Sequence, residues 1–599
     1  MWNKSGRHLV AILWMFLFTL SNVTFAEARD DLRSLADSYM ESTLKLLQPW
    51  AYDVDLPLNS HDRFLDNTPE ALAEFQGIED TVINSLHKIN PSELIDEKQR
   101  IFYIKFKEYI EANKGIRVCH DELWQFDPMF NGTHLLIEHL INIQPVTTQA
   151  DKAQTLQRWR AIKDYYQQEI VNLNEGLKLG YTAPKRVVKR VIGQLRRVVD
   201  AEFDSHPYLK LADRSNDKAF QQTFKTVVKK DVLPALKTYV DYLQQVYLVK
   251  TRNELGLHAN TNGRQCYIAK YRYYTSLQRT PEKVHKLGLE TVNRQEQEVI
   301  NLGKKLYGVN TFEAVLAKVS EDKHERFNSE ETLHGFYQET IRRAAQAMPE
   351  AFDHMPSISL IVEPVPEHLR GTGVSPTYQA GNAATPGKFI YDPATYTGQK
   401  RGHAERLAVH EGFPGHHLQV ALSQDQTLFH PIERLFTTNA YREGWARYAE
   451  TLSEELGIFH SNSTLIYRRA WPARGMVVDT ALHMLGWNNE QVKAFIAKSG
   501  RESMAEALLD RMAIAPAQLT AYDSGALAIF SLRKMAKEKL GNCFDLRAFH
   551  HHVLKNGNVP LIELRAQIET WVNNRVTVNN GNTQKCAPQS TLQSTTKTQ

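Results

Sequence analysis

The sequence predicts a mostly α-helical fold with a small β element. Apolar residues recur at three- and four-residue spacing in many segments, which is the period of an amphipathic helix, whereas alternating strand patterns are scarce. The 599 residues, 42% hydrophobic and 23% charged, are enough for several domains with sizeable cores. The formal net charge is only +4, so we expect no nucleic-acid partner.

The first 26 residues have the features of a secretory signal peptide. Lys4 and Arg7 precede an apolar run over residues 9–20, and Thr24 and Ala26 place small residues at the two cleavage positions. The run is shorter than the ~20 residues that span a bilayer. We therefore expect cleavage after Ala26, a periplasmic or secreted protein, and no stable membrane insertion afterwards. An uncleaved anchor is the alternative.

Four cysteines could form up to two disulfides in an oxidising compartment. Three connectivities are possible. Sequence order favours Cys543 with Cys586, which would pin the last helix and the tail, and Cys119 with Cys266. Free buried thiols are the alternative.

Five segments carry clear helical patterns: residues 31–47, 81–87, 96–112, 156–176 and 284–306. The last begins most clearly, because Thr280 is a good N-cap, Pro281 suits the first helical position and Glu282 places an acid in the first turn.

The β element is predicted shortly before the histidine-rich motif described below. Residues 357–362 and 388–392 are the better strand candidates. The glycine- and proline-rich stretch 364–398 predicts an irregular connection with a short strand, where substrate-binding loops often occur.

We divide the chain into four parts. These are the signal peptide 1–26, a helical N-terminal part 27–355, a metal-binding catalytic part 356–575 and a tail 576–599. The tail is rich in Asn, Thr, Ser and Gln, so we expect it to be disordered.

A histidine-rich motif provides candidate metal ligands. His410 and Glu411 are followed by a Pro-Gly pair at 414–415 and then by His416 and His417. The usual zincin helix has its second histidine four residues after the first. On a straight helix these later histidines would lie about 9–11 Å along the axis, so the Pro-Gly pair must form a bulge or sharp turn. His416 is then the favoured ligand and His417 contacts the ligands or the substrate, although the two could be exchanged.

Glu443 is the predicted third ligand. Two imidazoles and a carboxylate hold three positions of a tetrahedral Zn²⁺ and leave the fourth for water. Glu411 would be the general base that takes the proton of the attacking water. Glu450 lies seven residues after Glu443, on nearly the same helix face, and could orient a ligating histidine. Solvated glutamates are the alternative.

These motifs resemble the bacterial family known as domain of unknown function 885, which is similar to distant gluzincin metallopeptidases. The resemblance covers most of the mature chain, through residues 263–288, 409–419, 443–450, 474–487 and 516–525. It implies a multi-helix zincin or gluzincin-like architecture with the small β element next to the metal helix.

Three further residues are candidates for contact with the substrate. Tyr522 and His483 lie in family-like motifs and could donate a hydrogen bond to the tetrahedral oxyanion, with ordinary packing as the alternative. Tyr378 precedes the metal helix, where an exposed strand edge could bind an extended peptide.

Arg474 and Arg511 could bind the C-terminal carboxylate of a peptide, because a guanidinium forms two hydrogen bonds with a carboxylate. Structural ion pairs with Asp479 or Asp510 are the preferred alternative.

The predicted function is therefore zinc-dependent hydrolysis of peptides. A metal-dependent hydrolase of another amide or ester is one alternative, and a non-catalytic periplasmic binding or scaffold protein is the other. The cut site, the end preference and the oligomeric state stay open.

Overall fold

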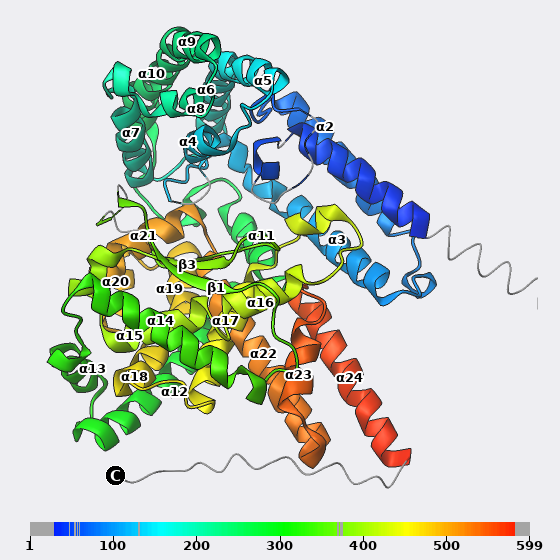
Figure 1. Cartoon of the computed structure of the whole chain (residues 1–599), viewed down its shortest axis with the longest axis vertical. Helices are drawn as coiled ribbons and strands as arrows, with labels where there is room; N and C mark the ends of the chain where they lie inside the picture. The colour runs from blue at the N-terminus through cyan, green and yellow to red at the C-terminus, as the bar shows by residue number, and fades with distance from the viewer. Residues whose placement is uncertain are drawn as a thin grey trace, which may run out of the picture. The chain divides into compact units, whose positions relative to one another are not determined.

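The computed structural model describes residues 29–581, except 47, 53–55, 57, 59, 130–131, 368–369 and 372–374. The predicted signal peptide lies outside these residues. The described chain is mostly helical with one three-stranded sheet, which confirms the predicted mostly α fold (Figure 1). Within the same residues, no helix combines the length and the apolar character needed to cross a membrane.

The chain forms two compact units. Unit 1 contains the described residues up to Tyr273 together with 428–436 and 506–516, and unit 2 contains 274–427, 437–505 and the residues from Ala517 onward. These units are defined by compactness. They do not follow the predicted boundary at residue 355, and residues 428–436 and 506–516 from the C-terminal half belong to unit 1.

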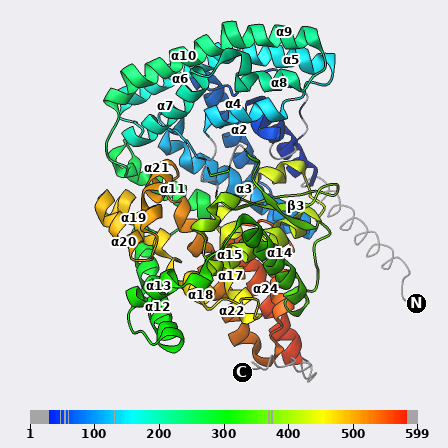
Figure 2. The ribbon, with the colours of Figure 1, turned by 60° about the vertical axis from the view of Figure 1, so that its left-hand side comes forward.

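Unit 1 is helical. Residues 29–46 form a helix, followed by α2 (Pro69–Leu86), α3 (Glu97–Ile116), α4 (Thr133–Ile143), α5 (Gln149–Arg160), α6 (Ile162–Leu179), α7 (Lys185–Val199), α8 (Lys210–Asp213), α9 (Lys218–Val227), α10 (Leu233–Tyr242), α11 (Gly263–Thr275) and most of α21 (Ala505–Ile514). In this unit α6 packs against α5 and α10, and α5 against α9 (Figure 2).

The predicted helix over 156–176 is two helices, which corrects the sequence-based interpretation. The backbone N–H of Ala161 is shared between the carbonyls of Arg158 and Gln157, so α5 tightens and ends there before α6 starts. The predicted segments 31–47 and 96–112 match observed helices within a few residues, and 81–87 is the end of the longer α2.

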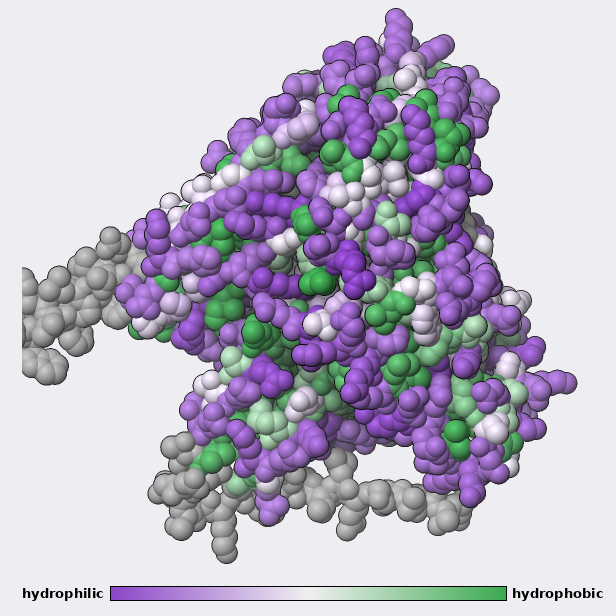
Figure 3. Space-filling view, turned by 180° about the vertical axis from the view of Figure 1, so that it is seen from behind, coloured by the Kyte–Doolittle hydropathy of each residue, from purple (hydrophilic) through white to green (hydrophobic). Residues whose placement is uncertain are grey.

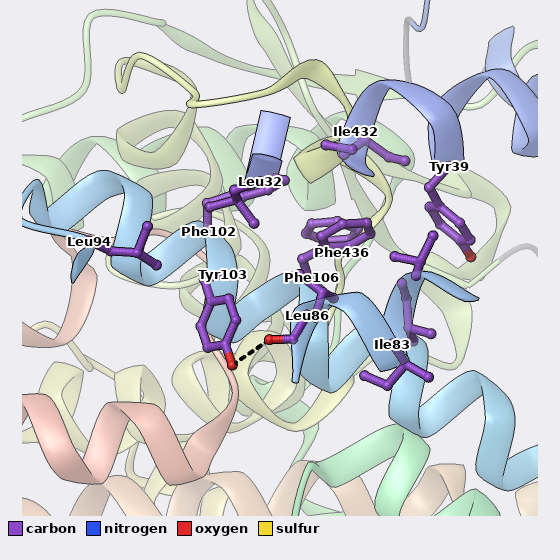
Figure 4. Packing of buried hydrophobic residues seen from close by; sticks show 13 residues of the cluster. Leu32, Tyr39, Ile83, Leu86, Leu94, Phe102, Tyr103, Phe106, Ile432 and Phe436 are labelled. Atoms are coloured by element: carbon purple, nitrogen blue, oxygen red, sulfur yellow. Dashed lines mark hydrogen bonds between the residues drawn. The ribbon is translucent and has the colours of Figure 1, made fainter. Parts of the chain in front are cut away.

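A buried aromatic and aliphatic cluster joins the first helix, α2 and α3 to the segment 428–436 (Figure 4). Phe102 and Phe106 of α3 both lie against Phe436. The Tyr103 hydroxyl donates to the Leu86 carbonyl oxygen at 3.1 Å, so the one polar atom of that side chain is satisfied. This cluster explains why 428–436 belongs to unit 1.

The predicted disulfide between Cys119 and Cys266 is present in unit 1. The other predicted pairing includes Cys586, which lies outside the described residues.

Unit 2 contains the sheet and the helices around it. Its helices are α12 (Pro281–Tyr307), α13 (Phe312–Glu321), α14 (Glu330–Ala347), α15 (Arg401–Glu411), α16 (His416–Gln424), α17 (Asn439–Glu455), α18 (Asn462–Ala470), α19 (Arg474–Met484), α20 (Asn489–Ala497), α22 (Gln518–Leu540), α23 (Leu546–Leu554) and α24 (Leu561–Gly581). α12 starts as predicted, with the Thr280 side chain accepting from the Lys283 backbone N–H. α24 extends to Gly581, beyond residue 576 where we predicted a disordered tail, and the later residues lie outside the described chain.

The sheet consists of β1 (Leu360–Pro364), β2 (Thr377–Gln379) and β3 (Gly387–Tyr391) in the order β1-β3-β2. β3 pairs in parallel with β1 and antiparallel with β2. The sheet lies next to α14, and α16 lies against α17 (Figure 1). β3 matches the predicted strand within one residue, whereas β1 begins three residues later than predicted.

The surface seen in Figure 3 is mainly hydrophilic, with hydrophobic residues dispersed among polar ones. This distribution agrees with the ordinary composition of the chain.

Helices α17 and α22 cross at a pair of glycines. A Cβ atom on Gly444 would lie 2.5 Å from Gly525 Cα, and one on Gly525 would lie 1.8 Å from the Ala440 carbonyl oxygen. The two backbones therefore approach more closely than any side chain allows. This contact positions Glu443, which directly precedes Gly444.

Gly525→Ala is therefore expected to lower the free energy of unfolding by about 1–3 kcal/mol, because the crossing must open to admit the methyl group. Gly335→Ala on α14 is the matched control, since its Cβ would meet nothing within 4 Å. Urea denaturation of both variants gives the comparison. Equal midpoints for Gly525→Ala and the parent protein would contradict this interpretation of the crossing.

Candidate metal centre

A sharp turn replaces the regular helix between the two halves of the histidine motif. α15 ends at Glu411 and α16 begins at His416. A Cβ on Gly415 would lie 1.9 Å from the His410 carbonyl oxygen, so only glycine allows this close return of the chain. The Trp445 indole N–H donates to the Pro414 carbonyl oxygen at 2.9 Å and fastens the turn to α17. His416 is thereby brought back beside His410.

The structure brings the three predicted ligands together. Glu443 Oε2 lies 3.7 Å from His410 Nε2 and 3.5 Å from His416 Nε2. All three potential ligand atoms lie within 4.8 Å of one another, and the two imidazole planes are almost perpendicular, at 88°. Zinc bonds of ~2.0–2.1 Å in a tetrahedron place ligand atoms about 3.3 Å apart. The donor set therefore fits Zn²⁺ in chemistry and in spacing.

Glu411 is buried beside this group. Burial raises the pKa of its carboxyl above the ordinary value, opposed by the nearby His416 and His410. The backbone N–H of Tyr378 in β2 also donates to it. A carboxylate with a raised pKa next to a metal-binding group is suited to accept and return a proton.

His417 points away from the ligand group. Its Nδ1 lies 3.2 Å from the Tyr378 hydroxyl, and its ring packs edge-on against Phe413. Burial lowers the pKa of His417 to about 4, so this imidazole is neutral at pH 7. Gly387 of β3 leaves room for this pair, because its Cβ would lie within 3.0 Å of both side chains. His417 and Tyr378 thus join α16 to the sheet.

Glu450 connects the ligand group to two arginines. Its Oε1 lies 2.9 Å from His410 Nδ1 and accepts from Arg406 Nη1 at 2.8 Å and from Arg447 Nη1 at 3.0 Å. Burial alone would raise the pKa of this carboxyl, but Arg447, Arg406 and His410 together hold it far below the ordinary value. An ionised Glu450 accepts a hydrogen bond from the Nδ1–H group of His410, an arrangement that directs Nε2 toward a metal.

Glu450→Gln is expected to weaken zinc binding by about 10–100-fold and to destabilise the protein by about 3–5 kcal/mol, because two buried guanidinium groups lose their shared carboxylate. Chelator competition and urea denaturation measure the two effects. Glu454→Gln is the matched control, since Glu454 also binds two arginines but forms no hydrogen bond with a histidine of the described chain. Unchanged zinc affinity in Glu450→Gln would contradict the orienting role.

The other predicted site residues have different surroundings. Arg474 is buried, forms an ion pair with Glu296 and donates to the Ala470 carbonyl oxygen at 2.9 Å. Asp479 is buried and accepts from the Ala517 backbone N–H at 2.9 Å. The ion-pair partner of Arg474 is therefore Glu296 and not one of the two aspartates considered from the sequence.

The remaining predicted residues differ in their exposure and in the compact unit to which they belong; they are Tyr522, His483 and Arg511. Tyr522 on α22 is partly exposed, and the Arg447 guanidinium carbon lies 5.8 Å from its ring centroid. His483 on α19 is fully buried. Arg511 belongs to unit 1, whereas the ligand group belongs to unit 2.

Sequence reasoning missed Arg406, Arg447 and Arg501. Arg406 precedes His410 by four residues and Arg447 follows Glu443 by four, so each lies one turn from a ligand on the same helix face. This four-residue spacing from a predicted ligand could have identified Arg406 and Arg447 as neighbours of the site. Arg501 has no comparable signal, because it lies in a connection after α20.

Comparison with known proteins identifies the family. Residues 51–568 match the family model described as bacterial protein of unknown function, DUF885. The chain belongs to this family. A comparison of this DUF885 member with curated proteins gave no match.

Two solved structures resemble this DUF885 protein over almost its whole length. One is a protein from Colwellia psychrerythraea described as a lipoprotein, with TM-score 0.80 and 22% identity over 91% of this chain and 99% of that chain. The other, from Shewanella oneidensis, is described as a lipoprotein of unknown function, with TM-score 0.72 and 18% identity over 90% and 99%. At these identities the likeness establishes the shared fold alone.

Proposed function

We propose that this DUF885 protein is a zinc-dependent peptidase related to the gluzincins. The observation that carries the proposal is the convergence of His410 Nε2, His416 Nε2 and Glu443 Oε2 beside the buried Glu411. A closed structural zinc site needs four protein ligands, whereas this group offers three and an adjacent base. We also propose a periplasmic or secreted location, supported by the pattern of the first 26 residues and by the lipoprotein descriptions of both structural relatives.

When bound, zinc would supply a Lewis acid that polarises the scissile carbonyl and makes water a better nucleophile. His410, His416 and Glu443 would hold it. Glu411 takes a proton from the attacking water and gives it to the departing amine. We assign oxyanion donation to Tyr522 in preference to His483, because Tyr522 is partly exposed whereas His483 is fully buried.

The sheet supports a peptide as the substrate. β2 is an edge strand, and its Tyr378 backbone N–H reaches Glu411. An extended peptide that paired with this edge would pass close to the proposed base.

Zinc binding is expected to release about one proton at pH 7. Burial opposes a charge on His410, but Glu443 and Glu450 outweigh it and raise the pKa of this imidazole to about 9 in the metal-free protein. Ligation through Nε2 displaces that proton, so the apparent affinity should rise about tenfold per pH unit below pH 9. Calorimetry at pH 7 in buffers of different ionisation enthalpy counts the protons. A count of zero would contradict a protonated His410.

A panel of substrates tests the proposed function. Purified, zinc-loaded protein is incubated with peptides of mixed length and, separately, with non-peptide amides and esters. Cleavage of peptides alone supports the proposal. Turnover of only the non-peptide compounds would mean that this site hydrolyses another class of amide or ester. Binding of peptides without turnover would favour the non-catalytic alternative.

A further inference from the structure

Arg406, Arg447 and Arg501 form a cationic group beside the candidate metal centre, which we name the arginine cluster; Arg406 and Arg447 are buried and Arg501 is partly exposed. Arg406 lies one helical turn before His410 on α15, and Arg447 lies one turn after Glu443 on α17. One turn corresponds to about 5.4 Å along a helix. The arginine cluster therefore forms the next layer below the ligand layer, and Glu450 bridges the two layers.

The arginine cluster carries more positive charge than its neighbours neutralise. Arg406 and Arg447 are at least 91% buried and share Glu450, yet the Nε atom of each has no hydrogen-bond partner among the described residues. Asp523 Oδ1 lies 3.8 Å from Arg447 Nε, and burial raises the pKa of the Asp523 carboxyl, which weakens it as a counter-ion.

Arg501 adds to the surplus. Its guanidinium carbon lies 4.7 Å from the Trp471 ring centroid, and it forms no ion pair with a carboxylate of the described chain. Burial, together with Arg406 and Arg447, lowers the pKa of Arg501 to about 9. Two buried guanidinium groups and a partly exposed third, with only Glu450 and Asp523 as the carboxylates described beside them, favour binding of an anion.

Other arginines of unit 2 have carboxylate partners of their own, since Arg474 pairs with Glu296 and Arg533 with Glu455. Arg469 donates to both oxygens of Glu454 and to Glu298, with distances of 2.8 and 2.9 Å. The arginine cluster differs from these arginines because its three guanidinium groups have only Glu450 and Asp523 as described carboxylate neighbours. Arg501 and Tyr522 are partly exposed, so one edge of the cluster can be reached from solvent.

We propose that the arginine cluster binds the C-terminal carboxylate of the peptide substrate and that the protein is a carboxypeptidase. This inference rests on the proposed peptidase function. An extended chain advances about 3.3–3.6 Å per residue, so one turn of helix between the two layers accommodates one or two residues between the scissile carbonyl and the terminal carboxylate. Hydrolysis breaks the scissile C–N bond, joins the oxygen of water to the carbonyl carbon, and delivers the proton taken from that water to the released amine.

Paired peptides of one sequence, one with a free C-terminal carboxylate and one C-terminally amidated, test the inference. Zinc-loaded Glu411→Gln protein measures binding without turnover by calorimetry, and the parent protein measures cleavage by mass spectrometry. We expect the free acid to bind about 10–100-fold more tightly than the amide and to lose one or two C-terminal residues.

Arg501→Gln should remove most of this preference for the free acid. Arg501 forms no hydrogen bond with Glu450, so its loss should leave the ligand layer intact. Arg469→Gln is the matched control and should keep the preference. Circular dichroism checks that both variants are folded, and the comparison of the two peptides on the parent protein needs no variant.

The outcomes separate the two proposals. Equal binding and internal cleavage of both peptides would overturn the carboxylate site and leave the peptidase function standing. Tighter binding of the free acid without any cleavage by the parent protein would overturn the peptidase function and support the carboxylate site. An equal loss of affinity for both peptides in Arg501→Gln would overturn the role of the arginine cluster.

Discussion

Glu411→Gln is expected to lower kcat/KM for peptide hydrolysis by about 10²–10⁴-fold while zinc binding stays within a few-fold of the parent protein. Glutamine has the shape of glutamate but cannot accept a proton from water. Glu411 is also outside the group of three converging ligand atoms, so its replacement removes no ligand. Steady-state kinetics with a cleaved peptide and chelator competition give the two values.

The matched control for this variant is Glu455→Gln on α17. Glu455 binds Arg533 and forms no hydrogen bond with the ligand group of the described chain. It should retain the parent rate. If Glu411→Gln kept more than about a tenth of the parent activity, Glu411 would not be the base, and a different proton acceptor would be required.

His416→Gln is expected to weaken zinc binding by more than about 100-fold and to abolish peptide hydrolysis, whereas His417→Gln should change zinc affinity by less than about tenfold. His416 Nε2 lies 3.5 Å from Glu443 Oε2, but His417 Nδ1 faces the Tyr378 hydroxyl. Loss of a direct ligand should exceed the 10–100-fold effect of losing an outer partner. Competition with a chromophoric chelator measures both variants.

These two variants form a matched pair, because the substitutions are identical and the positions are adjacent. Both side chains are buried, so any general effect of placing glutamine on α16 should be shared. The opposite ranking of zinc affinities would mean that His417 is the ligand and that the turn opens when metal binds.

Local signals predicted much of the helical structure. The Thr280-Pro281 start of α12 depends on residues within one turn, and its capping bond is present. β2 was not predicted as a separate strand, because three residues are too few to show alternation and its pairing with β3 is not local. The end of α5 at Arg160 was missed for a related reason, since no proline or glycine marks it.

The candidate site was predictable where sequence spacing constrains geometry. Pro414 and Gly415 stood where a regular helix would fail, so a turn that returns His416 to His410 could be expected from the residues alone. The glycine crossing of α17 and α22 could not, because a close helix contact depends on tertiary packing. The arginine cluster also required the structure, since Arg501 joins it from a different segment.

Mass spectrometry of a mixed peptide library tests peptide hydrolysis most directly. Zinc-loaded parent protein and zinc-loaded Glu411→Gln protein are incubated side by side, and new fragments are sequenced. We predict new fragments in the parent sample alone, each a library peptide shortened at its C-terminal end. No fragments in either sample, with zinc bound in both, would contradict peptide hydrolysis at this site.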